Sequence, residues 1–342
     1  MKYIKKNSVI FCIYLLCAVV RGEIVSASLA AGLSAIVAGG MAGFNFVVCR
    51  FKECCGDRWI HENFTGLAEE LNSKLYGQYL VVKPVVNHLK GHSKGNPSKA
   101  LALSFHGWTG TGKNFVARII AESMYKKGMS SKYVKLISAT KEFPHEEMLP
   151  LYKDKLRELI ESSVKQCEKT MFIFDEMDKM PPGLIDTIKP YLDYYENLGG
   201  VDYRKAIFLF LSNTAGGDIA EEAMKYWNEG KKREDITLKD MELIIQTPAL
   251  NVKSGLWHSE LITKHMITAY IPFLPLERKH VKECIRDGLI TGGYYKKRSE
   301  IPEVKVSEIL EELTFYPEGA GIFSTTGCKR VLEKIDYVME EV

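Results

Sequence analysis

Short apolar runs alternate with amphipathic stretches over most of the chain. Five runs have the length and the continuous apolar character of strands that are covered on both faces. These runs are Ala100–Phe105, Tyr133–Ser138, Met171–Phe174, Ala206–Leu211 and Met266–Tyr270. Between them, Asn114–Met124 and Glu147–Cys167 place apolar residues at helical spacing. The alternation predicts an α/β fold in which helices cover both faces of a parallel sheet.

The pattern changes after Pro275, where we expect no further strand. Helical stretches follow around Glu277–Asp287, Val306–Thr314 and Gly327–Glu341. We therefore predict a large α/β domain over residues 51–275 and a small helical domain over residues 276–342.

Two apolar segments precede the α/β domain. Residues 1–22 combine early lysines, an apolar run and the small Gly22, which is the layout of a cleaved secretory signal peptide, with an uncleaved anchor as the alternative. Residues 24–49 carry no charge, so we assign residues 23–50 to a membrane-associating segment. As a helix it is long enough to span a bilayer, but its small residues also suit a shallow hairpin in one leaflet, and both possibilities stay open.

The charge balance gives no reason to expect a polyanionic partner. The chain has 46 basic and 43 acidic residues, so its formal net charge is +3 and we predict no nucleic-acid partner. Hydrophobic residues make up 46% of the 342 positions, which excludes a disordered tail or a small disulfide scaffold.

Six cysteines follow the predicted signal peptide, and more than one pairing fits them. They are Cys49, Cys54, Cys55, Cys167, Cys284 and Cys328. Asn63 begins the sequon Asn-Phe-Thr, so we expect it to be glycosylated in a secretory compartment.

A glycine-rich loop joins the first predicted strand to the first helix after it. It reads Gly107, Trp108, Thr109, Gly110, Thr111, Gly112, Lys113 and Asn114, which matches the pattern G-x-x-x-x-G-K. Such a loop points backbone N–H groups at phosphates, and Lys113 would reach the β- and γ-phosphates of a nucleoside triphosphate. Asn114 replaces the usual Ser or Thr, and its carboxamide oxygen would face Mg²⁺. A glycine-rich turn without nucleotide is the alternative.

Polar residues end two further predicted strands. Asp175 and Glu176 follow Met171–Phe174, where Asp175 would hold Mg²⁺ and Glu176 would deprotonate the attacking water. Asn213 follows the next strand and would position that water, although an ordinary turn residue is the alternative. Lys329 opens the last predicted helix, from which it would reach the nucleotide unless it is only a helix-start residue.

These elements, in this order, resemble the AAA+ superfamily, and their details resemble the torsins of the endoplasmic reticulum. The unusual Asn114 is torsin-like, as are Phe172–Met180, Leu198–Asp202, Ile271–Leu276 and Gly327–Lys329. The resemblance implies a P-loop NTPase that binds ATP and Mg²⁺, with residues 107–114 as Walker A, Asp175 and Glu176 as Walker B, Asn213 as sensor 1 and Lys329 as sensor 2.

The same resemblance implies further sites. Gly77 and Gln78, ahead of an expected strand over Leu80–Val82, would flank the adenine. Cys284 and Cys328 would form a redox-sensitive pair beside the nucleotide. Cys49 and Cys167 would form a second disulfide.

The position where related ATPases carry an arginine finger holds Lys264 instead. An ammonium group lacks the planar fork that suits a transferring phosphoryl group. The resemblance implies that the lumenal domain of a transmembrane protein of the nuclear envelope or reticulum supplies the arginine. We expect self-association or a ring with this activator, membrane contact through residues 24–49, and weak activity alone.

Together these observations predict a membrane-associated, lumenal AAA+ ATPase with chaperone-like activity. It would use partner-stimulated ATP hydrolysis to remodel a protein or a membrane. An ATP-dependent scaffold that hydrolysis only resets is one alternative, and a holdase that needs no turnover is another.

Overall fold

The computed structural model describes residues 49–251, 261 and 265–340. A short N-terminal unit ends at Cys54, and a larger unit from Cys55 onward contains the sheet and the helices of the site. No helix in the described ranges is long and apolar enough to cross a membrane. The predicted signal peptide and nearly all of the apolar segment 24–49 lie outside the described residues.

The core of the larger unit is a parallel sheet of five strands in the order β2-β3-β4-β1-β5. The strands are β1 (Leu101–Gly107), β2 (Val134–Ser138), β3 (Met171–Asp175), β4 (Ile207–Ser212) and β5 (Ala269–Phe273). The predicted fold class is confirmed. The last strand lies further along than predicted and includes Pro272. This proline is tolerated because β5 is an edge strand, where a missing N–H breaks no ladder.

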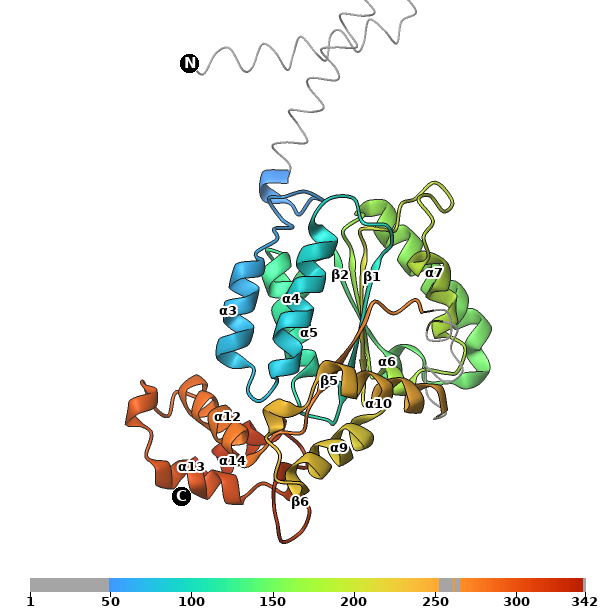
Figure 1. Ribbon diagram of the computed structural model, residues 1–342. Helices are drawn as coiled ribbons and strands as arrows, with labels where there is room; N and C mark the ends of the chain where they lie inside the picture. The colour runs from blue at the N-terminus through green and yellow to red at the C-terminus, as the bar shows by residue number, and fades with distance from the viewer. Residues whose placement is uncertain (1–48, 252–260, 262–264, 341–342) are drawn as a thin grey trace, which may run out of the picture. The chain divides into compact units, whose positions relative to one another are not determined.

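Helices cover both faces of this sheet (Figure 1). One layer consists of α3 (Phe64–Lys74), α4 (Tyr79–Ser93) and α5 (Lys113–Met124). The other face carries α7 (Leu149–Gln166), α9 (Gly216–Asn228) and α10 (Leu238–Asn251). Short α6 (Ala139–Glu142) and α8 (Lys189–Leu192) complete the α-helices of the large domain within the described ranges. Two separate apolar clusters, one for each face, hold the layers together.

The expected strand over Leu80–Val82 is wrong, because these residues lie in α4. Three apolar residues in a row look like a strand start. The apolar pattern continues at helical spacing, however, and Val81, Val85 and Leu89 are buried along one face of the helix.

Aromatic pairs fix the register at the centre of the sheet. Phe172 lies opposite Phe208 and Phe174 opposite Phe210 on β3 and β4, with ring centroids 5.0 and 5.4 Å apart. Because the two strands are parallel and in register, their carboxyl ends lie at the same edge of the sheet. The residues that follow β3 and β4 are therefore neighbours.

Three helices pack around a core of their own after Leu276. They are α12 (Arg278–Thr291), α13 (Glu303–Glu311) and α14 (Val331–Met339). The expectation of no further strand is wrong, since β6 (Phe315–Tyr316) and β7 (Phe323–Ser324) form an antiparallel pair. Strands of two residues are too short to leave a periodic pattern.

Short 3₁₀ helices connect several of these elements. They are η1 (Gly128–Ser130), η2 (Glu146–Met148), η3 (Met177–Lys179), η4 (Ile185–Ile188), η5 (Arg233–Asp235) and η6 (Arg298–Glu300).

The disulfides correct one predicted pairing. Cys167 bonds to Cys55, and Cys49 bonds to Cys54, so the expected Cys49–Cys167 bond is wrong. Either of the adjacent cysteines at positions 54 and 55 could pair with Cys49 or with Cys167, and spacing in the sequence does not decide between these pairings. Cys167 lies in the same buried apolar cluster as Tyr125. The third disulfide joins Cys284 and Cys328, as the family resemblance implied.

We expect Cys55→Ser/Cys167→Ser to lower the free energy of unfolding more than Cys49→Ser/Cys54→Ser does. The two bonds close loops of 112 and 5 residues. Chain entropy then predicts losses of about 5 and about 2 kcal/mol. Urea unfolding at equilibrium measures both, and equal losses would contradict the assigned pairing.

Candidate functional site

The glycine-rich loop wraps around the start of α5. Gly110 and Gly112 have φ of 71° and 110°, in the left-handed region that glycine adopts without strain. A Cβ atom on Gly110 would lie 1.8 Å from the carbonyl oxygen of Thr326. Glycine is thus required at Gly110 for the backbone conformation and also for the close approach of the C-terminal helical domain.

Lys113 is a buried cation at the N-terminus of α5. Its Nζ lies 2.7 Å from the carbonyl oxygen of Gly107 and 2.8 Å from that of Trp108. It also donates to Oδ1 of Asn213 at 3.0 Å. Burial lowers the pKa of Lys113 to about 8, although the carboxylate of Asp178 acts in the opposite direction. The ammonium group therefore connects the loop to the end of β4.

Asp175 and Asn114 form a hydrogen-bonded pair beside this lysine. Nδ2 of Asn114 donates to Oδ2 of Asp175 at 2.8 Å. The described residues include no cluster of three or more His, Cys, Asp or Glu side chains that would bind a metal alone. One carboxylate with one carboxamide oxygen is instead the donor set that Mg²⁺ takes together with phosphate oxygens and water. The pair fits a magnesium ion that arrives with a nucleotide.

Glu176 has a strained backbone and two hydroxyl partners. Its φ is 55°, which is unusual outside glycine and is frequent at functional sites. Oε2 accepts hydrogen bonds from Thr140 and, at 3.4 Å, from Ser138. Sequence analysis did not identify these two residues. Their position at the end of the second predicted strand was the available signal, since Ser138 lies opposite Asp175 in the sheet.

Asp178 is a third carboxylate that sequence analysis missed. Its Oδ1 accepts from the backbone N–H of Asn213 at 2.9 Å and lies 3.4 Å from the side-chain Nδ2. With Nδ2 directed at Asp178, Oδ1 of Asn213 faces Lys113. Asp178 thus fixes the orientation of the amide. The only sequence signal was its place two residues after Glu176.

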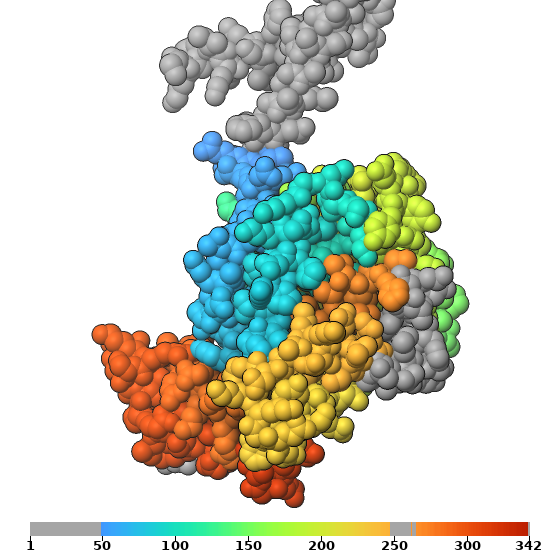
Figure 2. Space-filling view, in the orientation of Figure 1, coloured from blue at the N-terminus to red at the C-terminus, as the bar shows by residue number. Residues whose placement is uncertain are grey.

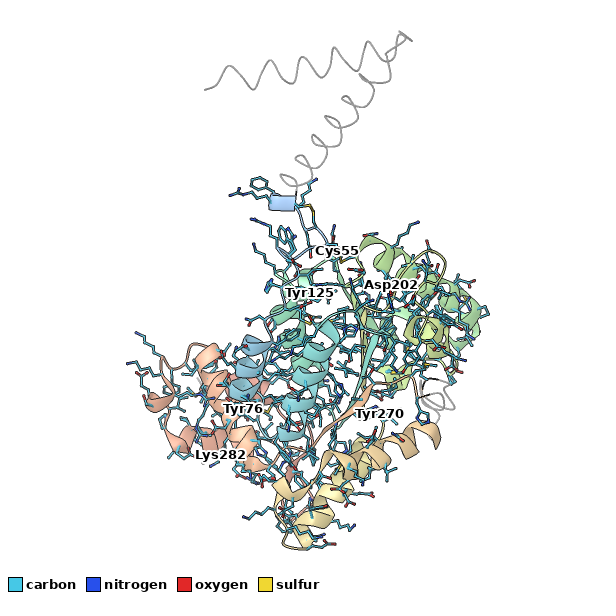
Figure 3. The ribbon with its side chains drawn as sticks, turned by 45° about the horizontal axis from the view of Figure 1, so that its top comes forward. Cys55, Tyr76, Tyr125, Asp202, Tyr270 and Lys282 are labelled. Carbon is cyan, nitrogen blue, oxygen red and sulfur yellow. A yellow bond between two sulfur atoms is a disulfide. The ribbon has the colours of Figure 1, made fainter. Side chains whose placement is uncertain are left out.

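One side of a cavity of about 640 Å³ is lined by Lys113, Asn114, Asp175, Glu176 and Asn213. Leu75 and Tyr76 line its other side, together with Asp287 on α12 and Leu332 on α14. The hydroxyl of Tyr76 donates to Asp287 at 2.6 Å, and Arg298 contacts both groups. Tyr76 lies where the N-terminal helices meet the C-terminal helices (Figure 3). The cavity has the size of a small-molecule site.

Gly77 and Gln78 are not among the residues that line this cavity. Gln78 is buried, and its amide donates to the carbonyl oxygens of Thr111 and Leu274 while accepting from the N–H of Leu274. Gln78 therefore ties the P-loop to the end of β5. The residues just before it, Leu75 and Tyr76, face the cavity instead.

Lys329 lines the cavity from the C-terminal helical domain. It lies in the turn ahead of α14, which begins at Val331, so the predicted start of this helix at Gly327 is wrong. Gly327 has a φ of 55°, which is incompatible with a right-handed helix. The N–H of Cys328 donates to the carbonyl oxygen of Gly110 at 3.1 Å. The Cys284–Cys328 disulfide also lines the cavity.

Two further predicted residues lie elsewhere. Asn63 is exposed as the N-cap of α3, where its side chain accepts from the N–H of Gly66 at 3.0 Å. Lys264, at the position expected for an arginine finger, lies outside the described residues.

A parallel sheet with a phosphate loop, strand-end carboxylates and an adjoining helical domain defines an AAA+ P-loop ATPase fold. Solved chains of Hsp104 share it. The S. cerevisiae Hsp104–ADP complex matches with a TM-score of 0.56 and 15% identity over 80% of this chain and 46% of that chain.

The chain belongs to the torsin family. A family model for torsins matches residues 49–174, and one for the C-terminal domain of torsin-1A matches residues 276–338. A torsin-like protein of Caenorhabditis elegans is 41% identical over 86% of this chain and 82% of its own. Human torsin-3A is 40% identical over 85% of this chain and 73% of its own.

We expect Asp178→Asn to weaken binding of Mg·ATP about tenfold relative to Mg·ADP. The neutral side chain no longer holds the amide of Asn213 in one orientation. A hydrogen bond to a charged group contributes about 1.4 kcal/mol at the lower end of its range, and this free energy corresponds to a factor of ten in affinity. Calorimetric titration with each nucleotide measures the ratio. Adding Asn213→Ala should then have little further effect.

Asp154→Asn is the matched control, because Asp154 is an exposed carboxylate on α7 that contacts Arg157. An unchanged ratio in Asp178→Asn, or an equal change in the control, would contradict the assigned role of Asp178.

Affinity for Mg·ATP should fall about tenfold between pH 7 and pH 9. The pKa of Lys113 is lowered to about 8, so the charged form that attracts phosphate predominates below pH 8 and is lost above it. Calorimetry across this range measures the effect. Lys113→Arg should show a flat profile, because a guanidinium group stays charged. A flat profile for the unmodified protein would contradict this prediction.

Proposed function

We propose that this torsin binds and hydrolyses ATP, with help from a partner, to remodel a protein or a membrane in the lumen of the endoplasmic reticulum and nuclear envelope. The observation that carries the proposal is the meeting of Lys113, Asn213 and the Asn114–Asp175 pair on one cavity of nucleotide size. In that cavity the N–H groups of the P-loop and the N-terminus of α5 would receive the phosphates.

Asn114 and Asp175 would hold Mg²⁺ together with oxygens of the bound phosphates. The ion would neutralise charge on the phosphates. Lys113 would turn from the carbonyl oxygens of Gly107 and Trp108 towards the β- and γ-phosphates. Asn213, held by Asp178, then remains beside the position of the γ-phosphate, where its amide orients the attacking water.

Glu176 is the proposed general base. Its carboxylate lines the cavity but accepts hydrogen bonds from Thr140 and Ser138. These bonds would hold the carboxylate away from an attacking water. Release from the two hydroxyls would allow Glu176 to take a proton from water, so this contact provides a gate on hydrolysis.

The proposed partner is the lumenal domain of a transmembrane protein that supplies an arginine. Within the described residues, Arg118 on α5 is the only arginine that lines the cavity. It lies about one and a half turns beyond Lys113, with its guanidinium group over the ring of Phe115. An arginine supplied by another chain raises phosphoryl-transfer rates by about 10³–10⁵-fold. Self-association, or a ring formed with this partner, would place the arginine at the nucleotide cavity.

Several features support a lumenal, membrane-attached location. Disulfides persist in oxidising compartments, and the described residues contain three. Asn63, the proposed glycosylation site, is exposed. We propose that residues 24–49 contact the membrane, as their uncharged sequence indicates.

Lys329 and the Cys284–Cys328 disulfide would make the site sensitive to redox state. Cys328 directly precedes Lys329 and contacts the P-loop through Gly110. Reduction of the bond would release α12 from the turn that carries Lys329, and so weaken the contact of this lysine with the phosphates.

A scaffold that hydrolysis only resets, or a holdase, are the alternative functions. Lys113→Ala separates the holdase, since a holdase should survive loss of nucleotide binding. Glu176→Gln separates the scaffold, because a remodelling enzyme would trap its partner and lose function.

We expect Glu176→Gln to bind Mg·ATP as tightly as the unmodified protein but to lose at least about 100-fold in partner-stimulated turnover, the scale of general-base catalysis. ATP-dependent pulldown from reticulum membranes with this variant identifies the partner. An ATPase assay with the retained protein measures the turnover.

Glu142→Gln, which removes an exposed carboxylate on α6, is the control and should leave turnover unchanged. Turnover near about 10 per second by the pure protein, the median for enzymes, would refute the need for a partner.

A further inference from the structure

A second cavity of about 230 Å³ lies where α9 ends. Its walls come from the end of α9 and the segment through η5, and from Glu277, Lys279 and Phe323 at the start of α12 and on β7. In Figure 1, α9 ends beside β6, and Figure 2 shows the surface of α9 against the surface of the C-terminal segment. The second cavity shares no lining residue with the nucleotide cavity.

Basic side chains predominate around this cavity. They are Lys231, Lys232, Arg233 and Lys279, against the two carboxylates of Glu234 and Glu277. Glu277 is already shared between Lys279 at 3.0 Å and Arg233 at 3.5 Å. Lys232 is exposed and has no ion-pair partner within the described ranges. Lys231 is paired with Glu229 at 2.6 Å, so the surplus of positive charge comes from Lys232 and from the sharing of one carboxylate by Arg233 and Lys279.

Arg233 is the buried member of this group. Its side chain is 6% exposed, and Nη2 donates to the carbonyl oxygen of Gly77 at 2.8 Å. Its Nε is buried and has no hydrogen-bond partner among the described residues. A guanidinium group has five N–H donors, and a buried donor without an acceptor is rare in folded proteins. An added acceptor in the cavity would satisfy donors that the fold leaves free.

The remaining walls are apolar or aromatic. Ala223, Ile236 and Phe323 are buried at its base, and Tyr226 and Trp227 line it. Trp227 is 53% exposed, which is high for the largest apolar side chain. Tryptophan, tyrosine and arginine are the residue types that dominate binding at protein interfaces. A free inorganic anion would gain nothing from these apolar contacts, whereas a peptide would.

We propose that this cavity receives an aspartate or glutamate side chain of a partner protein, with an apolar neighbour of that residue packed on Trp227. The carboxylate meets Arg233, Lys232 and Lys279. Because the walls belong to both α9–η5 and the start of α12, the docked segment bridges the large domain and the C-terminal helices. The proposal does not require nucleotide binding.

The experiment uses the full chain labelled with 5-fluorotryptophan and observed by ¹⁹F NMR. The chain has four tryptophans, and Trp227→Phe assigns the resonance of Trp227. The probe is the tripeptide acetyl-Phe-Glu-Phe-amide, and its Gln analogue is the neutral counterpart. We expect a saturable shift of the Trp227 resonance, with the neutral tripeptide binding at least tenfold more weakly.

Variants at exposed lysines test the charge without disturbing the buried Arg233. Lys232→Gln/Lys279→Gln should weaken binding of the acidic tripeptide about tenfold. Lys225→Gln is the matched control, since Lys225 is an exposed lysine on α9 that does not line the cavity. Equal losses in both would overturn the proposal.

Two other results would also overturn it. One is the absence of a saturable shift with the acidic tripeptide. The other is an equal shift with inorganic phosphate at the same concentrations, which would make the cavity a general anion site. Failure of ATP binding would leave this test unaffected, so the two proposals fail separately.

Discussion

The buried ammonium group of Lys113 is the constraint on which the nucleotide site depends. A charge removed from water is costly unless acceptors surround it. The fold provides them from separate segments: the carbonyl oxygens of Gly107 and Trp108, and the amide oxygen of Asn213. They meet because β1, β3 and β4 are adjacent parallel strands whose carboxyl ends share one edge. The same edge places Asp178 where it orients Asn213 and compensates the charge of the lysine.

The C-terminal helical domain completes this site by direct contact with the P-loop. Thr326 and Cys328 approach Gly110 so closely that only glycine fits there. A shift of the P-loop on phosphate binding would therefore displace the turn that carries Lys329. The second cavity lies at the same junction, with Arg233 joining Gly77 to the start of α12. Nucleotide and a docked acidic segment would thus act on the same junction between the large domain and the C-terminal helices.

The local pattern of apolar residues predicted much of the fold. It failed where a run was too short, or where the same run fits both a helix and a strand. Five strands and the P-loop were predictable because continuous apolar runs and glycine spacing are properties of contiguous residues. The run Leu80–Val82 was misleading, since three apolar residues fit the start of a helix face as well as a strand. The pairing of Cys167 with Cys55 rather than Cys49 could not be predicted, because the sequence does not tell which of three cysteines close together in the chain lies beside Cys167 in space.

The sequence by itself determined the class of fold, the position of the glycine-rich loop and the family, because these depend on motifs within single segments. Only the tertiary structure decided which polar groups meet. Thr140 and Ser138 at Glu176, Asp178 at Asn213, and Tyr76 at Asp287 are pairs formed between segments. The family resemblance implied that Gln78 flanks the adenine, and in the structure its amide bonds Thr111 and Leu274. Hydrogen bonds act over about 3 Å in space, and distance along the chain does not report that separation.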